Sequence, residues 1–264
     1  MEYRPSHHSS SLCNIILLHQ NYIKFYWFYY YYYMYNIKVG NGDRKVVLDY
    51  IEAKRQANPN FKVVDVGGSV EGWSAKHIDA LIDFNAPEND TGILHFDFDI
   101  THPDGWKIVH DYVEQNGKFD FCICCHTLED IMNPGYVCEQ LSKIAIEGYI
   151  AVPSKHCELA IFDAYYTASS KHRESKLHYG HRGYMHHRWI MSICDNMFIG
   201  FPKTGYLEKM ETFNRFNKYN KEIADLSFFW KDEIKITYLN NNYLGPNAAT
   251  IVKLYDLLLE DEFL

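Results

Sequence analysis

Acidic and glycine residues follow one apolar run of this 264-residue chain in an order typical of a ligand-binding turn. Asp65 lies next to the end of the run 62–66, Gly67 and Gly68 follow the run directly, and Gly72 comes four residues after Gly68. Glycine lets the backbone approach a ligand closely, because no Cβ intervenes, and it permits the positive φ of a tight turn. The pattern therefore indicates a binding turn, although the glycines could also be structural and Asp65 could cap a helix.

Three further acids lie at or near the ends of later apolar runs. Asp83 lies about as far beyond the glycine turn as the acid that holds ribose hydroxyls in dinucleotide-binding folds. Asp97 and Asp99 alternate along the run 93–100, so they share one face of a strand and at most one is expected to touch a ligand. A solvated strand end is the alternative interpretation of Asp83.

A histidine and two acids follow the fourth apolar run, 119–125. His126 is the first candidate for a general base, because an imidazole titrates near neutral pH, and Glu129 is the second. His126 could instead be a hydrogen-bonded core histidine. Glu129 and Asp130 could be first-turn acids that a helix dipole favours.

A histidine-rich polar segment follows the fifth run, with five of the fourteen histidines between His172 and His187. Three interpretations are open, namely a polar loop anchored by Trp189, a metal site, and a lid over the substrate. His186 and His187 are adjacent, so they would point to different faces of a strand or helix. No flanking Asp, Glu or Cys completes a ligand set, and no metal site is predicted.

The lid is the interpretation that we adopt for this segment, over residues 155–205. Its residues expected to face the substrate are Tyr184, His186 and Arg188, and His187 is a third candidate for catalysis. Trp189 is expected to anchor the segment against the core. Such a lid would lie near the carboxyl ends of the strands, where ligands bind in open α/β sheets.

The elements that position these residues are predicted by alternating apolar and helical patterns. Strands are expected at 62–66, 80–84, 93–100, 119–125 and 149–153, and helices at 44–58, 106–117 and 133–148, with Gly148 ending the last helix. Near-continuous apolar strands that alternate with helices predict a doubly wound α/β fold with a mostly parallel sheet. Residues 226–230 and 233–238 are expected to extend this sheet at its edge as antiparallel strands.

Four segments resemble the class I S-adenosylmethionine-dependent methyltransferases. They read VVDVGGSVEGW, FDFDIT, FDFCICCHTLEDIMNP and GYIAVPS, and the resemblance covers roughly residues 44–155. It implies a Rossmann-like fold, S-adenosylmethionine as cofactor, and a cofactor methionine part surrounded by Asp65 and the loop 67–72. By the same resemblance Asp83 would hold the ribose hydroxyls, Asp99 would lie by the adenine amino group, and His126 would lie beside the methyl-transfer site.

The function expected from these residues is methyl transfer to a small-molecule or glycan-like acceptor. A non-catalytic, methyltransferase-like binding or scaffolding protein is the alternative. A nicotinamide-dependent oxidoreductase is a further alternative, but it would be expected to show a tighter GxGxxG turn than the loop 67–72 of this chain.

Composition indicates one domain over residues 34–264, since 47% hydrophobic residues can fill an α/β core of this size. The net charge of −8 argues against tight nucleic-acid binding. Seven cysteines without paired CxxC spacing predict buried thiols in a reducing, cytoplasmic compartment. Residues 1–33 are a low-complexity aromatic leader that lacks about twenty consecutive apolar residues, so no membrane span is expected, and Met34 is a candidate start.

Overall fold

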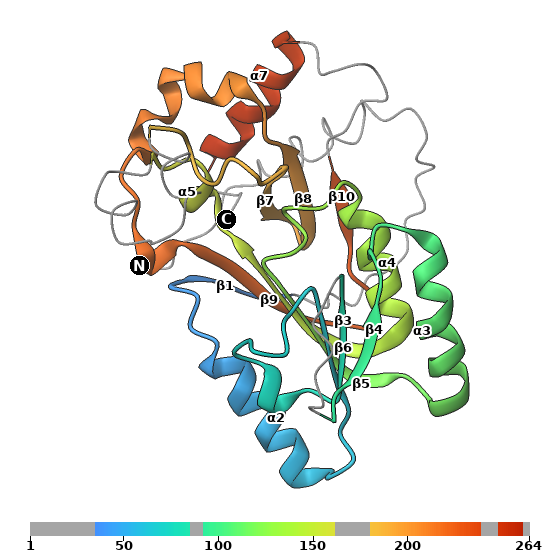
Figure 1. Cartoon of the computed structure of the whole chain (residues 1–264). Helices are drawn as coiled ribbons and strands as arrows, with labels where there is room; N and C mark the ends of the chain where they lie inside the picture. The colour runs from blue at the N-terminus through green and yellow to red at the C-terminus, as the bar shows by residue number, and fades with distance from the viewer. Residues whose placement is uncertain (1–34, 85–91, 162–179, 239–247, 261–264) are drawn as a thin grey trace, which may run out of the picture.

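The computed structural model describes residues 35–84, 92–161, 180–238 and 248–260, so the aromatic leader and Met34 lie outside the described residues. The large sheet has seven strands, which are β1 (Asn36–Gly40), β2 (Val63–Val66), β3 (Ala80–Asp83), β4 (Leu94–Asp97), β5 (Phe119–Cys125), β6 (Ala145–Pro153) and β9 (Asp225–Lys231). Their order is β1-β9-β6-β5-β2-β3-β4 (Figure 1). Strands β2 to β6 are parallel, whereas β9 is antiparallel to both of its neighbours.

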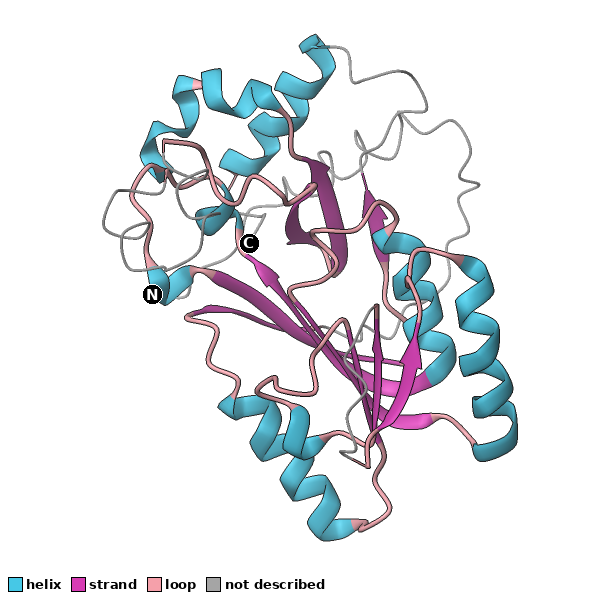
Figure 2. Cartoon of the chain, viewed as in Figure 1, coloured by secondary structure: helices cyan, strands magenta, loops and turns pink. Residues whose placement is uncertain are grey.

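Helices cover both faces of this sheet (Figure 2). Helix α2 (Lys45–Ala57) packs on one face, and α3 (Pro103–Asn116) and α4 (Pro134–Ile144) pack on the other. Side chains alternate along each strand, so Val63 joins the core beneath α2 and Val64 joins the core beneath α3 and α4. The predicted doubly wound, mostly parallel, Rossmann-like fold is therefore confirmed.

The predicted end of the third helix is wrong. Helix α4 ends at Ile144 and β6 begins at Ala145, so Gly148 lies inside the strand. A Cβ at Gly148 would lie 2.4 Å from the carbonyl oxygen of Cys122 and 2.7 Å from the Trp230 ring. Glycine is required there because neighbouring strands approach closely, and this requirement cannot be distinguished locally from a helix stop.

The predicted edge position of the last strands is also wrong. Strand β9 is antiparallel, as expected, but it lies between β6 and β1. Strand β1, which the sequence analysis did not identify, forms the edge instead. Strand β10 (Ile236–Tyr238) leaves this sheet and pairs with β8 (Met197–Pro202) in a second sheet.

This second sheet has three strands, β10, β8 and β7 (Trp189–Cys194). Trp189 and Met191 face the main core, whereas Ile190 and Phe201 face a separate apolar cluster. The helical elements around that cluster are η3 (Gly205–Lys209), η4 (Glu211–Phe216), α7 (Ala248–Asp256) and η6 (Leu257–Leu259). Residues 155–205, which were expected to form a lid, thus contain the buried β7–β8 hairpin. Residues 180–188 form the described loop that precedes this hairpin.

The described cysteines are free thiols that lie buried or half-buried, as predicted; they are Cys122, Cys124, Cys125, Cys138, Cys157 and Cys194. Among the described residues, no helix combines the length and the apolar character that a membrane crossing requires. The parallel strands direct their carboxyl ends toward α5 (Lys155–Glu158) and the second sheet (Figure 1).

Candidate active site

A buried carboxyl group lies near the end of β2 and contacts the loop that follows. Asp65 is 3% exposed, and its Oδ2 accepts a hydrogen bond of 2.5 Å from the Ser74 hydroxyl. Burial raises the pKa of Asp65 to about 6, although the bond from Ser74 opposes this shift. Asp65 therefore closes the loop 66–74 on itself, at the carboxyl end of β2.

Gly67 brings this loop into direct contact with the turn after β5. Its φ is +76°, and a Cβ on it would lie 2.3 Å from Thr127 Oγ1. Its backbone nitrogen donates to the carbonyl oxygen of Ile82 at 2.8 Å, which ties the loop to β3 as well. Both the positive φ and the close approach strongly favour glycine at this position. The loops after β2 and β5 are therefore immediate neighbours.

Three further residues predicted to hold the cofactor, Gly68, Gly72 and Asp83, lie in different surroundings. Gly68 lies against Asp65, since a Cβ there would be 2.3 Å from Oδ2. Asp83 ends β3 opposite Asp97 of β4, and burial, together with the Asp97 charge, raises the pKa of Asp83. Gly72 lies farther along the loop and lines a separate hollow of about 1000 Å³.

Asp99 is used in a local turn beyond β4. Its Oδ1 accepts hydrogen bonds from the backbone nitrogen of Thr101 at 2.9 Å and from the Thr101 hydroxyl at 2.7 Å. These two bonds lower the pKa of Asp99. The side chain is 44% exposed, so Oδ2 remains accessible at the carboxyl edge of the sheet.

His126 is the first residue of the turn after β5. Its φ is +53°, which is unusual for a residue other than glycine, and its backbone nitrogen donates to Ala151 of β6 at 2.8 Å. Nε2 lies 3.0 Å from Asp225 Oδ2, and Nδ1 lies 3.5 Å from Glu129 Oε1. This backbone conformation thus places the imidazole between two carboxylates.

These carboxylates control the protonation of the imidazole. Burial lowers the pKa of His126, but the hydrogen bond to Asp225 and the nearby charges of Asp225 and Glu129 outweigh burial and raise it to about 9. Burial would raise the pKa of Asp225, yet His126 and Arg44 lower it, and Arg44 Nη2 lies 2.8 Å from Oδ2. His126 is therefore an imidazolium at neutral pH, with Nε2 held by Asp225.

Glu129 is a buried carboxylate without a hydrogen-bond donor among the described residues. Its side chain is 1% exposed, and neither carboxylate oxygen accepts a hydrogen bond there. Its backbone carbonyl accepts from the nitrogens of Arg188 at 2.7 Å and Trp189 at 3.2 Å. Since an unsatisfied buried carboxylate is costly, such a group is an indication of a functional site.

A second buried carboxylate, Glu158 of α5, holds His187. Glu158 Oε1 lies 2.6 Å from His187 Nδ1, and Oε2 lies 2.5 Å from Lys203 Nζ. Burial would raise the pKa of Glu158, but His187 and Lys203 outweigh it and lower that pKa. Gly183 permits this arrangement, because its φ is +56° and a Cβ there would lie 2.6 Å from Glu158 Oε2.

The other nitrogen of His187 faces Asp130. Nε2 of His187 and Nε2 of His186 each lie 3.8 Å from Asp130 Oδ1. This oxygen is buried and accepts no hydrogen bond from the described residues. Two imidazoles and one carboxylate thus converge on a single point beside Glu129.

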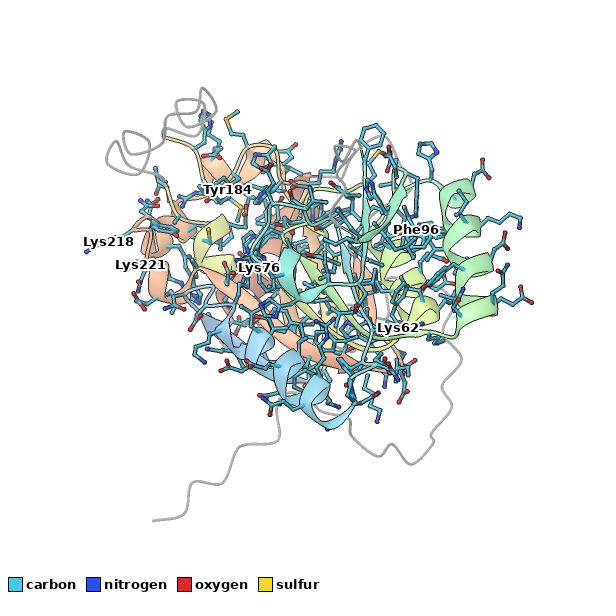
Figure 3. All side chains as sticks on the ribbon, turned by 60° about the horizontal axis from the view of Figure 1, so that its bottom comes forward. Lys62, Lys76, Phe96, Tyr184, Lys218 and Lys221 are labelled. Atoms are coloured by element: carbon cyan, nitrogen blue, oxygen red, sulfur yellow. The ribbon has the colours of Figure 1, made fainter. Side chains whose placement is uncertain are left out.

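The three predicted catalytic residues line one cavity. It has a volume of about 260 Å³, and its lining includes His126, Glu129, Asp130, His186, His187 and Asp225. Tyr184 also lines it, and Figure 3 shows Tyr184 on the side of the molecule that carries Lys218 and Lys221, away from Phe96 of β4. The structure therefore brings together residues that are separated along the chain by up to about a hundred positions.

The segment 180–188 is anchored at both ends. The guanidinium of Arg182 is buried and donates to the carbonyl oxygens of Leu159, Leu207 and Phe213. Trp189 is buried, as expected, and its Nε1 donates to Ile131 at 2.8 Å. Arg188 is exposed and does not line the cavity of 260 Å³, unlike the other two residues predicted to contact substrate.

Four residues of this region were missed by the sequence analysis, namely Arg44, Glu158, Lys203 and Asp225. Glu158 could have been predicted from the sequence, since it lies about one helical turn beyond the end of a strand and therefore near the carboxyl edge of the sheet. Asp225 carried a weaker one, because an antiparallel strand begins at the edge where its parallel neighbour ends. Arg44 and Lys203 carried none, since each reaches the site from an element remote in sequence.

No protein-family model and no curated protein matches the sequence. Among solved structures, the N-terminal domain of EvdMO1 in the presence of SAH and D-fucose is 8% identical, with a TM-score of 0.33 over 69% of this chain and 81% of that chain. A Thermoplasma acidophilum protein is 9% identical, with a TM-score of 0.30 over 74% and 91%. An S-adenosylmethionine dependent methyltransferase from Mesorhizobium loti is 12% identical, with a TM-score of 0.32 over 67% and 95%. Similarities with identities and TM-scores this low do not support a fold assignment, so the assignment rests on the order of strands in the sheet.

Proposed function

We propose that the chain is an S-adenosylmethionine-dependent methyltransferase that acts on a small-molecule or glycan-like acceptor. The observation that carries the proposal is the contact of Gly67 with Thr127. It joins the loop that resembles a donor-binding turn to the turn that supplies His126 and Glu129. Donor and acceptor held on the two sides of this contact would therefore meet directly, and positioning is the main contribution of a protein to methyl transfer.

The donor side is the carboxyl edge of β2, β3 and β4. In this proposal the loop 66–72 surrounds the methionine part, Asp83 holds the ribose hydroxyls, and Asp99 lies by the adenine amino group. The raised pKa of Asp83 is the direction expected of a partly buried carboxylate next to Asp97. Hydrogen bonds from two ribose hydroxyls would stabilise its ionised form.

The acceptor side is the cavity beside His126. Its volume of about 260 Å³ lies just below the range of roughly 300–1,000 Å³ that is typical of drug-sized ligands. Carboxylate and imidazole groups dominate its lining, so a compact acceptor rich in hydroxyl groups would find hydrogen-bond partners there. These features favour an acceptor of about the size of one sugar.

S-adenosylmethionine, when bound, supplies a methyl group that is already activated on a sulfonium centre. A hydroxyl acceptor must also lose its proton. Because the raised pKa of His126, about 9, leaves most of the ring charged at neutral pH, only the neutral form can accept that proton, and we assign the proton to Nδ1 of this form. Nε2 is occupied by Asp225 at 3.0 Å, whereas the 3.5 Å contact of Nδ1 with Glu129 exceeds a normal hydrogen bond of about 2.7–3.2 Å. Asp225 and Glu129 would stabilise the imidazolium that forms.

Calorimetry with the full chain tests the donor site. We expect micromolar-range binding of S-adenosylmethionine and of its demethylated product, and no binding of NAD. Asp83→Ala should weaken the binding by about 1.5–3 kcal/mol, because it removes charge-assisted hydrogen bonds. Asp104→Ala, at an exposed position in the first turn of α3, is the matched control and should leave affinity unchanged.

An absence of heat with either methionine ligand, on protein shown to be folded by circular dichroism, would remove the methyltransferase proposal. Tight donor binding without turnover of any hydroxylated acceptor would instead favour a non-catalytic binding protein. Binding of NAD alone would favour an oxidoreductase.

A further inference from the structure

We propose that Asp130, His186 and His187 bind a divalent transition-metal ion, and that Zn²⁺ suits the donor set best. Their ligand atoms, Oδ1 and two Nε2 atoms, all lie within 4.8 Å of one another. Imidazole nitrogen and carboxylate oxygen are common zinc ligands, with bonds of about 2.0–2.2 Å. Two such bonds can span the 3.8 Å between Asp130 Oδ1 and either Nε2 atom.

The environment of His187 matches that of a metal-bound histidine. Its Nδ1 lies 2.6 Å from the fully buried carboxylate of Glu158, which Lys203 neutralises from the other side. A proton on Nδ1 leaves the lone pair on Nε2, which faces Asp130. A histidine ligand commonly donates its second ring proton to a carboxylate in this way, which fixes both the tautomer and the ring orientation.

An independent observation comes from the carboxylates beside the cluster. Asp130 Oδ1 is buried without a hydrogen-bond donor among the described residues. Glu129, also without one there, is 1% exposed and lines the same cavity. A cation bound by Asp130 would offset this negative charge, and a water on that cation could donate to Glu129.

The turn that carries the histidines explains why the sequence predicted no metal. That expectation assumed a strand or a helix, in which neighbouring side chains point to different faces. Residues 185–186 instead form a turn, and the two rings lie with centroids 4.4 Å apart. The carboxylate that completes the set comes from the turn after β5, far away in the sequence.

Three protein ligands leave at least one position of a tetrahedral ion open, as in catalytic zinc sites. The open position would face the cavity that also contains His126 and Glu129. In a consequence that rests on the proposed function, the ion would bind the acceptor hydroxyl and lower the pKa of that hydroxyl, so that the neutral form of His126 could remove the proton.

Metal binding can be measured without any methyl donor or acceptor. The full chain, freed of metal with a chelator and dialysed, is titrated with ZnCl₂ by calorimetry, and bound zinc is counted by elemental analysis. We expect one high-affinity ion per chain. His186→Ala and His187→Ala should each weaken this site at least tenfold, and Glu158→Gln should weaken it about 10–100-fold through the His187 ring.

His181→Ala is the matched control, since this histidine belongs to the same segment, is exposed, and lies outside the cluster. It should leave zinc affinity unchanged. Circular dichroism checks the fold of each variant, and His186, which is exposed, keeps the test decisive if His187→Ala fails to fold.

No zinc binding by the folded wild-type chain would overturn the metal site, and so would binding that persists at full strength in His186→Ala. Donor affinity, measured separately, distinguishes this failure from a failure of the proposed function, because the residues proposed to hold the donor do not line the cavity beside the metal cluster. His186→Ala should leave that donor affinity within about threefold of wild type.

Discussion

Two neighbouring regions at the carboxyl edge of the sheet are built in different ways. The glycine-loop side comprises residues 65–74, the end of β3 at Asp83 and the turn at Asp99 beyond β4. These parts follow one another within a short stretch of chain. The cavity side, around His126 and His187, draws on the turn after β5, on α5 and on residues 180–188. It also draws on Lys203, just after the end of β8, and on the start of β9. Local sequence therefore specifies the first region, whereas only long-range packing assembles the second.

Electrostatics follow the same division. Asp65 is buried beside a hydroxyl group and has a raised pKa, so its charge is disfavoured. Asp225 and Glu158 are buried beside cations and have lowered pKa values, so their charges persist. Burial of an ionised group is tolerated only when a counter-charge lies close to it. The cavity side thus has charges whose removal should be costly.

Truncation of a buried carboxylate gives the largest expected effect. Glu158→Ala leaves Lys203 and His187 without their buried partner and should lower the free energy of unfolding by about 3–5 kcal/mol. Chemical denaturation followed by fluorescence measures it. Glu139→Ala, which removes an exposed pair with Lys143, is the control and should cost about 0–1 kcal/mol. Similar losses of unfolding free energy in Glu158→Ala and Glu139→Ala would show that the buried ion pairs of Glu158 stabilise the fold no more than an exposed pair does.

A backbone substitution tests the glycine-loop side. Gly67→Ala imposes an unfavourable φ and a contact with Thr127, so we expect a loss of about 1–3 kcal/mol in unfolding free energy. Donor affinity should fall with it. Gly205→Ala is the control, because a Cβ there meets no atom within 4 Å.

Combining Gly67→Ala with Thr127→Ala separates steric contact from backbone strain. Partial recovery of stability is expected, since the hydroxyl and methyl groups that face the new Cβ are gone. A Gly67→Ala variant with wild-type stability and donor affinity would show that the two loops do not depend on each other.

The pH dependence of stability gives the smallest expected effect, because the His126 side chain is 40% exposed and solvent screens its ion pairs. The pKa of His126 is raised from 6.5 to about 9 in the folded chain, so its contribution is fully present below pH 6.5 and is lost as the pH rises through 9. The pKa of Asp65 is raised to about 6, so its titration changes stability at lower pH than the titration of His126 does.

Thermal melting from pH 7 to pH 10 should show this loss in the wild type. His126→Gln should flatten the change, whereas His102→Gln, at an exposed position, should preserve it. An equal slope in wild type and His126→Gln would contradict the ion pairs assigned to Asp225 and Glu129.

Periodic patterns predicted most of the large sheet. The five parallel strands and the helices α2, α3 and α4 were identified because apolar spacing is a local property. The β7–β8 hairpin was missed, although Asp195 and Asn196 provided a signal. Both have positive φ, of 47° and 60°, and such residue pairs are typical of tight hairpin turns.

The sequence predicted the location of some residues of the candidate site but not of others. His126 and Glu129 follow a strand directly, so their position at the carboxyl edge could be inferred from the order of elements. Their partner Asp225 could not, because β9 enters the sheet from a distant part of the chain. The role of Glu158 depends on Gly183 and Lys203, which approach it only in the folded state.

The sequence by itself determined the order of strands and helices, the glycine turn after β2 and the acids that end β3 and β4. These depend on backbone preferences and on burial patterns that act over a few residues. Tertiary structure alone decided that His126 is an imidazolium, that Asp130 meets two adjacent histidines, and that Gly148 lies in a strand. Protonation and ligand geometry depend on distances of a few ångströms between segments, and such distances exist only after the chain has packed.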